Sequence, residues 1–208
     1  MIEPAKFALF IGVSWALILS PGPDMLYVIT RGMAHGRRAG MLSAVGVVCG
    51  ILVHTTAAAF GLTLILQTSA LAFLIVKIVG AVYLVYLGIK AWREKSTFQL
   101  QASAPTATSG ALFWQGVLSN VLNPKIAIFF LAFLPQFVNQ AGGQVAWQMA
   151  LLGLTFACFG LCFLLVVGYS SGTIGRWLTY RQQYARGFQR LAGGILIALG
   201  IRLALSER

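Results

Sequence analysis

Of the four acidic residues in the chain, Asp24 alone lies inside a long apolar stretch, directly after Pro21, Gly22 and Pro23. Two prolines and a glycine interrupt a helix, and Pro23 suits the first position of a helix that restarts there. Asp24 would then lie in the first turn, where the positive end of the helix dipole stabilises an anion. The carboxylate could serve this helix end alone. We favour a functional role, binding an ammonium group, exchanging a proton or both, because a charge in an apolar stretch is costly.

A second break has the opposite charge and consists of Asn123, Pro124 and Lys125. Asn123 is a favourable N-cap and Pro124 a favourable first helical residue. Free N–H groups at such a helix start bind carboxylate or phosphate, and Lys125 adds a donor. The alternative is a structural kink whose lysine is neutralised by a neighbouring acid. With cation affinity at Asp24 and anion affinity here, the two breaks suit a zwitterion, so the sequence predicts a small amino-acid-like substrate.

Two further ionisable side chains, His54 and Lys77, lie inside apolar segments. His54 shares a helix face with small residues such as Gly50, so it could relay protons or simply hydrogen-bond across a helix contact. Lys77 lies in the first part of its segment, where it could snorkel to the membrane interface, pair with Asp24 or bind a substrate carboxylate. Both residues are predicted as second-rank candidates for the site.

The composition is that of a membrane protein, with 59% hydrophobic and 9% charged residues in a chain of 208, against about 25% charged residues in soluble domains. The net charge of +11 would suggest nucleic-acid binding in a soluble protein. Here the fifteen Lys and Arg residues gather in a few short loops, which is the pattern of membrane topology. The sequence therefore predicts a chain surrounded by lipid, with no nucleic-acid partner.

The sequence gives little support for enzymatic or metal chemistry. It contains no H-E-x-x-H motif and no paired acids, so we predict that the protein is not an enzyme and needs no cofactor. Cys158 and Cys162 share a helix face and could form a soft-metal site, but free cysteines more often pack as small apolar residues. We predict no metal site, and we assign the glycines of the same segment, including Gly160 and Gly168, to close helix packing.

Six apolar segments are each long enough to cross a membrane, which takes about 20 residues. We expect an all-α, polytopic protein that forms one transmembrane domain over residues 1–208, with its first and fourth helices broken at their prolines. The six segments cover residues 5–30, 39–66, 70–89, 111–138, 145–169 and 188–205.

The chain divides into two comparable halves. Residues 1–92 and 111–208 each hold three predicted spans and each begin with a broken helix, and a polar linker joins them at 93–110. Because three is an odd number, the second half enters the membrane in the opposite orientation to the first. Inverted repeats of this kind place the substrate site of many transporters at the repeat interface. The faces of small residues would permit a homodimer but do not require one.

Basic residues alternate between successive loops and predict the orientation. The second and fourth loops, at 67–69 and 139–144, contain none. Since positive residues mark the cytoplasmic side, the odd loops are predicted inside and both termini outside. Arg202 and Arg208, at the outer end of the last segment, oppose this assignment. The basic residues of the first, third and fifth loops are Arg31, Arg37, Arg38, Lys90, Arg93, Lys95, Arg176, Arg181, Arg186 and Arg190.

Four motifs, in order along the chain, resemble the LysE/RhtB family of bacterial amino-acid exporters. The motifs are SPGPDMLYV at 20–28, RGMAHGRRAGMLSAVGVVCGILVH at 31–54, KIVGAVYLVYLGIKAWR at 77–93 and LSNVLNPKIAIFFLAFLPQFV at 118–138. The resemblance covers nearly the whole chain and is closer to the homoserine/threonine-type branch. It implies export of amino acids or their derivatives across the bacterial inner membrane, driven by the proton gradient. The alternatives are a soft-metal exporter that uses the two cysteines, and a membrane scaffold that transports nothing.

Overall fold

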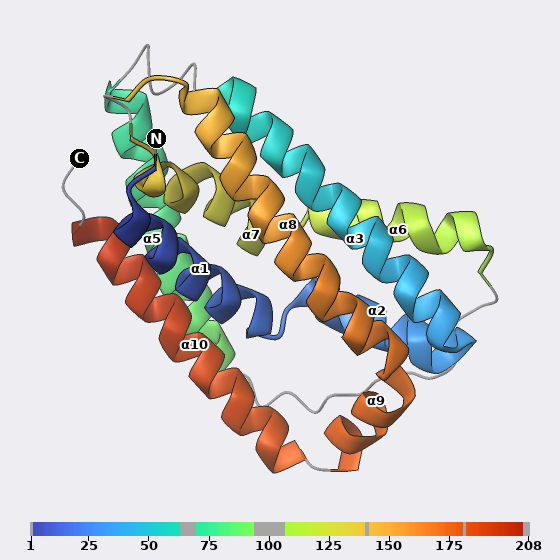
Figure 1. The fold of residues 1–208 in the computed structure, drawn as a ribbon. Helices are drawn as coiled ribbons and strands as arrows, with labels where there is room; N and C mark the ends of the chain where they lie inside the picture. The colour runs from blue at the N-terminus through green and yellow to red at the C-terminus, as the bar shows by residue number, and fades with distance from the viewer. Residues whose placement is uncertain (1, 63–69, 94–106, 140–141, 181, 206–208) are drawn as a thin grey trace.

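The computed structural model describes residues 2–62, 70–93, 107–139, 142–180 and 182–205, and every regular element within these ranges is helical (Figure 1). This confirms the all-α prediction. The predicted second loop and most of the predicted linker lie outside the described residues. The elements are α1 (Pro4–Leu19), α2 (Pro23–His35), α3 (Arg37–Ala57), the π-helix η1 (Ala58–Leu62), α5 (Ala70–Arg93), α6 (Ser109–Val121), α7 (Pro124–Ile128), the π-helix η2 (Phe129–Phe133), the 3-10 helix η3 (Leu134–Phe137), α8 (Val145–Tyr169), α9 (Ser171–Tyr180) and α10 (Gln182–Leu205).

Three described helices are long and apolar enough to cross a membrane, over Arg37–Gly61, Leu71–Arg93 and Val145–Tyr169. Two bent pairs, α1 with α2 and α6 with the segment Pro124–Phe137, each qualify as one further span. The described residues therefore hold up to five candidate spans, which fits a polytopic membrane protein. The sixth predicted span, residues 188–205, lies within α10 and stays a prediction.

The first predicted break separates α1 from α2. α1 ends at Leu19, Ser20 and Gly22 have extended backbones, and α2 starts with Pro23. The two helices are bent by 48°. Because proline has no N–H group with which to continue the helical hydrogen bonds, the chain turns here before the helix resumes.

The second predicted break separates α6 from α7 and is bent by the same 48°. α6 ends at Val121, Asn123 is the N-cap of α7, and Pro124 is the first helical residue. α7 then continues into η2 and η3, so the second part of this span is not a regular α-helix. The structure confirms both breaks that the prolines predict.

Two stretches predicted as loops are instead largely helical. α2 extends to His35 and α3 starts at Arg37, so the first loop shrinks to Gly36, whose φ of 85° favours glycine. In place of the fifth loop, α9 follows α8, and α10 begins at Gln182 rather than at residue 188. Basic residues mark the predicted cytoplasmic side but do not end a helix, since arginine and lysine are good helix formers.

Glycines set the closest contacts between the packed helices. α3 packs against both α6 and α8, and α5 pairs with α10 (Figure 1). A Cβ atom at Gly40 of α3 would lie 2.7 Å from the carbonyl oxygen of Gly168 in α8. A Cβ atom at Gly46 would likewise collide with the carbonyl oxygen of Phe113 in α6. Small residues let membrane helices approach this closely, which confirms the packing role predicted for Gly168.

An aromatic cluster lies between α1, η2 and α8. Phe10, Phe129, Phe133 and Phe156 belong to it, and each is at most 1% exposed. The ring of Phe129 lies 5.0 Å from that of Phe156 and 6.3 Å from that of Phe10, measured between centroids. Aromatic rings contribute large buried areas, so this cluster holds both broken spans against α8.

Four of the five tryptophans are exposed, and three of these lie near helix ends. Trp92 lies near the end of α5, Trp147 lies in the first turn of α8, and Trp177 lies in the last turn of α9, whereas Trp114 lies near the middle of α6. Tryptophan is enriched at the two membrane–water interfaces, where its ring sits at the level of the lipid headgroups. The three positions near helix ends fit interfacial anchors.

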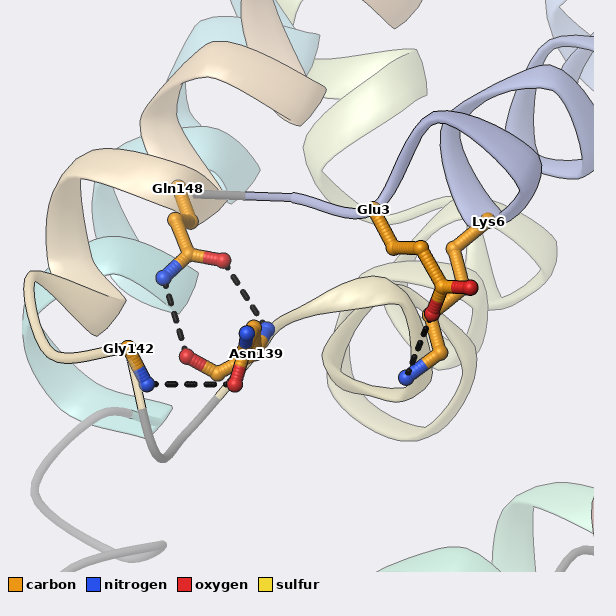
Figure 2. Close-up of polar contacts among 5 residues, drawn as sticks. All are labelled: Glu3, Lys6, Asn139, Gly142 and Gln148. Carbon is orange, nitrogen blue, oxygen red and sulfur yellow. Dashed lines mark hydrogen bonds and ion pairs between the residues drawn. The ribbon is translucent and has the colours of Figure 1, made fainter.

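Hydrogen bonds hold the described part of the loop between η3 and α8 (Figure 2). Buried Gln148 of α8 accepts from the N–H of Asn139 at 2.9 Å and donates to its carbonyl oxygen at 3.0 Å. The side chain of Asn139 in turn accepts from the N–H of Gly142 at 3.1 Å. Figure 2 also shows the ion pair of 3.9 Å between Lys6 and Glu3, which offsets one positive charge at the predicted outer end of α1.

Candidate functional site

The two breaks meet, and Asp24 of the first break accepts hydrogen bonds from the second. Its Oδ2 atom lies 2.8 Å from the Nδ2 atoms of both Asn120 and Asn123, which are 96 and 99 residues away in the chain. Hydrogen bonds to a carboxylate are stronger than those between neutral groups. The two amides therefore fix the orientation of the Asp24 side chain.

Lys125 of the second break is bonded in turn to the backbone of the first. Its Nζ atom donates to the carbonyl oxygens of Leu17 at 2.9 Å and Ser20 at 2.7 Å. These carbonyls lie at the C-terminal end of α1, where the helix has no N–H partners of its own and carries a partial negative charge. Lys125 is 8% exposed, and its ammonium has three donors, so one remains available.

The N–H groups at the start of α7 are already bonded within the second break, contrary to our expectation of free donors. The side chain of Asn123 accepts from the N–H of Lys125 at 3.0 Å, and its carbonyl oxygen accepts from the N–H groups of Ile126 and Ala127. Pro124, the first residue of α7, has no N–H to offer. The predicted anion site at this break would therefore depend on the Lys125 side chain.

Two buried oxygen atoms at the meeting point have no hydrogen-bond partner among the described residues. They are Oδ1 of Asp24 and Oδ1 of Asn120. Most buried polar atoms are hydrogen-bonded, so such an exception calls for a ligand, an ion or a water molecule. The Asp24 oxygen belongs to a residue that lines a cavity.

The cavity lies between the two breaks, α3 and α8, and leaves about 40 Å³ for the centres of water-sized groups. One water needs roughly 10–15 Å³ by this measure, so the cavity has room for a few such groups. Its polar lining comes from the breaks and consists of Ser20, Gly22, Asp24, Asn123 and Lys125. The residues that α3 and α8 contribute are apolar, namely Val47, Ile51, Phe156, Gly160, Phe163 and Leu164.

His54 reaches the site through Asn120. Its Nε2 atom lies 3.1 Å from the Asn120 carbonyl oxygen, which can only accept, so Nε2 carries a hydrogen. The same asparagine donates to Asp24 from its side chain. The bond joins α3 to α6 across a helix contact, one of the two alternatives for His54, and it also places His54 two hydrogen bonds from the carboxylate. His54 is not among the residues that line the cavity.

Lys77 and the two cysteines lie elsewhere. Lys77 is half-buried on α5 and does not line the cavity, and the hydrogen bonds of Asp24 go to the two asparagines rather than to Lys77. Cys158 and Cys162 are exposed on α8 and do not line the cavity either. Within the described ranges, no group of three or more His, Cys, Asp or Glu side chains could hold a metal ion.

The sequence did not point to two parts of this site. Asn120 was not predicted, although it lies one helical turn before Asn123, and that spacing places two amides on the same side of the chain. Gly160 was predicted to serve helix packing, yet it lines the cavity. Gly153, Gly160 and Gly168 are all glycines in one apolar helix. The sequence alone therefore does not show which of them contact another helix and which line a cavity.

A family model for LysE type translocators matches residues 15–207, nearly the whole chain. The chain belongs to this family. It is therefore a multi-pass membrane transporter and not an enzyme, and the resemblance of its four motifs is confirmed. No solved structure matches the chain.

Three relatives of this translocator cover most of its length. It is 30% identical over 206 residues to the uncharacterized membrane protein YrhP of Bacillus subtilis. The matched residues cover 95% of this chain and 97% of the relative. It is 32% identical over 193 residues to a homoserine/homoserine lactone efflux protein of Salmonella typhimurium, with 92% of both chains covered. A leucine efflux protein of Salmonella choleraesuis is 27% identical over 189 residues, with 90% and 89% covered.

Proposed function

We propose that this translocator exports small amino acids or amino-acid derivatives across the bacterial inner membrane. The observation that carries the proposal is the free Oδ1 atom of Asp24 beside a cavity that Lys125 also lines. A carboxylate oxygen without a hydrogen-bond partner and an ammonium donor, both on residues that line one cavity, match the two charged groups of an amino acid. Relatives that export homoserine, homoserine lactone or leucine support both the direction of transport and the substrate class.

Each charged residue has a defined role in this proposal. Asp24 binds the substrate ammonium through Oδ1, while Asn120 and Asn123 hold its other oxygen. Lys125 donates its third N–H to the substrate carboxylate while its other two donors hold the end of α1. The proline–glycine sequence of the first break and Pro124 of the second keep both helices interrupted, which leaves room for the cavity between them.

The same oxygen of Asp24 is the proposed site of the coupling proton. A proton on Oδ1 removes the charge that attracts an ammonium group, so proton and substrate exclude each other there. A proton arriving from outside displaces the substrate, and release of that proton into the cytoplasm frees the oxygen for the next substrate. His54, hydrogen-bonded to Asn120, is the second candidate for proton transfer.

The proposed architecture has six spans in two inverted three-helix repeats, residues 1–92 and 111–208, with α10 as the sixth span. The equal bends of 48° in α1–α2 and in the span that begins with α6 support it. The hydrogen bonds of Asp24 and Lys125 support it as well, because each connects one half to the break of the other. The basic loops are proposed to face the cytoplasm.

Counterflow of labelled amino acids in proteoliposomes, with and without a pH gradient, tests the function. Asp24→Asn keeps the shape of the side chain and an acceptor oxygen but removes the charge. A hydrogen bond to a charged group contributes about 1.5–3 kcal/mol, so we expect transport to fall roughly 10- to 150-fold and to lose its response to the gradient. Glu3→Gln, the same change at an exposed acid, is the matched control. Wild-type rates in Asp24→Asn that still follow the gradient would contradict the proposal.

A further inference from the structure

We propose that the α8 wall of the cavity selects the side chain of the substrate, and that Gly160 sets the largest side chain admitted. The substrates are then amino acids with compact, uncharged side chains, and amino acids with a cationic side chain are rejected. This inference rests on the proposed function, because it assumes that the amino and carboxyl groups bind at the two breaks.

The distribution of polar groups around the cavity determines which wall the side chain of a bound substrate faces. Every lining residue from α3 and α8 is apolar, whereas the charged lining residues, Asp24 and Lys125, come from the breaks. The cavity has four further apolar lining residues, Leu17, Ile18, Met25 and Ile126, so α3 and α8 supply six of its ten apolar residues. A substrate whose two charged groups meet Asp24 and Lys125 therefore directs its side chain to an apolar wall that α3 and α8 mostly form. An ionised side chain would lose its hydration there and find no partner in the wall, which is costly.

Gly160 differs from its neighbouring glycines in what surrounds it. A Cβ atom at Gly168 would lie 2.7 Å from the backbone of Gly40, and one at Gly153 would lie 2.5 Å from the hydroxyl of Thr55, so helix contacts require glycine at both positions. A Cβ atom at Gly160 would have one neighbour within 4 Å, the terminal Cδ1 of Ile51 at 3.3 Å. Helix packing therefore does not demand a glycine here.

Because the cavity is small, the absence of a side chain at Gly160 affects how much room a substrate has. The cavity has room for only a few water-sized groups, and Gly160 lies on the α8 face between Phe156 and Phe163, which are four and three residues away. A methyl group at position 160 would project toward the space that a substrate side chain needs. Phe163 lines the same cavity and is only partly buried, so a shorter side chain there would enlarge the space beside Gly160.

The test compares transport of alanine, leucine and lysine by the full-length protein in proteoliposomes. We expect the wild type to transport alanine and leucine and to exclude lysine. Gly160→Ala should lower leucine transport relative to alanine about 10-fold, the effect of one methylene in an apolar pocket. Phe163→Ala should shift the ratio in the opposite direction. Gly12→Ala is the matched control, because Gly12 is exposed on α1 and a Cβ there has nothing within 4 Å.

The possible outcomes separate this inference from the proposed function. If the wild type transports none of the three amino acids, the proposed function itself fails. If it transports them but both variants keep the wild-type leucine-to-alanine ratio, α8 does not select the side chain. Transport of lysine as fast as leucine would overturn the rejection of cationic side chains. Should Gly160→Ala fail to fold, Phe163→Ala decides alone, since an unchanged ratio in that variant contradicts the proposal.

Discussion

The two breaks have the same bend of 48° but are stabilised in different ways. The second break caps itself, because the Asn123 side chain accepts from the N–H of Lys125 two residues later. The first break has no such cap: Gly22 offers no side chain, and the open end of α1 is bonded by Lys125 from the other half. One break is therefore a local structure, and the other depends on a partner about a hundred residues away.

This difference indicates different roles for the two charged residues, Lys125 and Asp24. Lys125 spends two of its three donors on backbone carbonyls and keeps one, so its larger contribution is to the fold. Asp24 has one oxygen held by two asparagines and the other free, so its larger contribution is to ligand binding. Replacement of Lys125 should impair folding most, whereas replacement of Asp24 should impair transport most.

Lys125→Met should have the largest effect on stability. It leaves the carbonyl oxygens of Leu17 and Ser20 without partners, and each unsatisfied buried group costs about 1–3 kcal/mol. We expect a loss of several kcal/mol in the free energy of unfolding, measured in detergent, together with loss of transport. Lys77→Met, at another lysine within a span but outside the cavity, should affect both much less. Equal stability of the two variants would refute a structural role for Lys125.

Asn123→Ala and Asn120→Ala separate the effect of the N-cap of α7 from that of an asparagine within α6. Each variant removes one donor to Asp24 and should weaken transport. Asn123→Ala also removes the N-cap of α7, which contributes about 1 kcal/mol, so it should unfold at the lower denaturant concentration. The reverse order would show that the packing of Asn120 against Gly50 contributes more than the cap.

His54→Gln tests whether the bond to Asn120 carries protons or only joins two helices. Glutamine keeps an N–H donor but does not titrate in the physiological range. We expect a change below about 1 kcal/mol in stability and a weaker response of transport to the pH gradient. His54→Leu, which loses the donor, is the control for the structural part. A full gradient response in His54→Gln would assign the histidine to helix contact alone.

Gly22→Ala should have the smallest effect, although Gly22 belongs to the break that defines the first span. Its φ of −152° is extended backbone that any residue adopts, and a Cβ atom there would lie 3.5 Å from Nζ of Lys125, an ordinary contact. We expect a change within about 0.5 kcal/mol. Gly36→Ala, at a φ of 85°, should cost more than 0.5 kcal/mol by the same measurement. A large loss at Gly22 would show that the first break needs freedom that the structure does not indicate.

The sequence predicted both breaks, because proline acts on the residues next to it whatever the rest of the fold does. It also indicated that Asp24 and Lys125 belong together through their charges. It did not reveal that Lys125 would bond to backbone carbonyls, since every backbone position offers a carbonyl and none is marked in the sequence. Asn120 was missed for a related reason: inside an apolar helix, an asparagine can face a site, a neighbouring helix or the loop that follows.

The helical ends were predicted less well than the breaks. Arg31 and Arg37 were assigned to a loop because of their charge, yet both lie in helices, and only Gly36 separates α2 from α3. Basic residues indicate which side of the membrane a segment faces, whereas a residue with positive φ, such as Gly36, marks where the chain turns. The two need not occur at the same position. The role of Gly160 depends on the distance to the next helix, which no local pattern encodes.

The exposed tryptophans provide natural markers for how the chain sits in lipid. Trp92, Trp114 and Trp177 lie on the predicted cytoplasmic side, and Trp147 lies on the other, in the first turn of α8. Trp15 instead stacks on Phe159 with ring centroids 5.4 Å apart, in the middle of the first span. Lipids brominated near the headgroup should therefore quench the fluorescence of the four exposed indoles more than that of Trp15. The depth of the chain in lipid can thus be measured from its own tryptophan emission, without any attached dye.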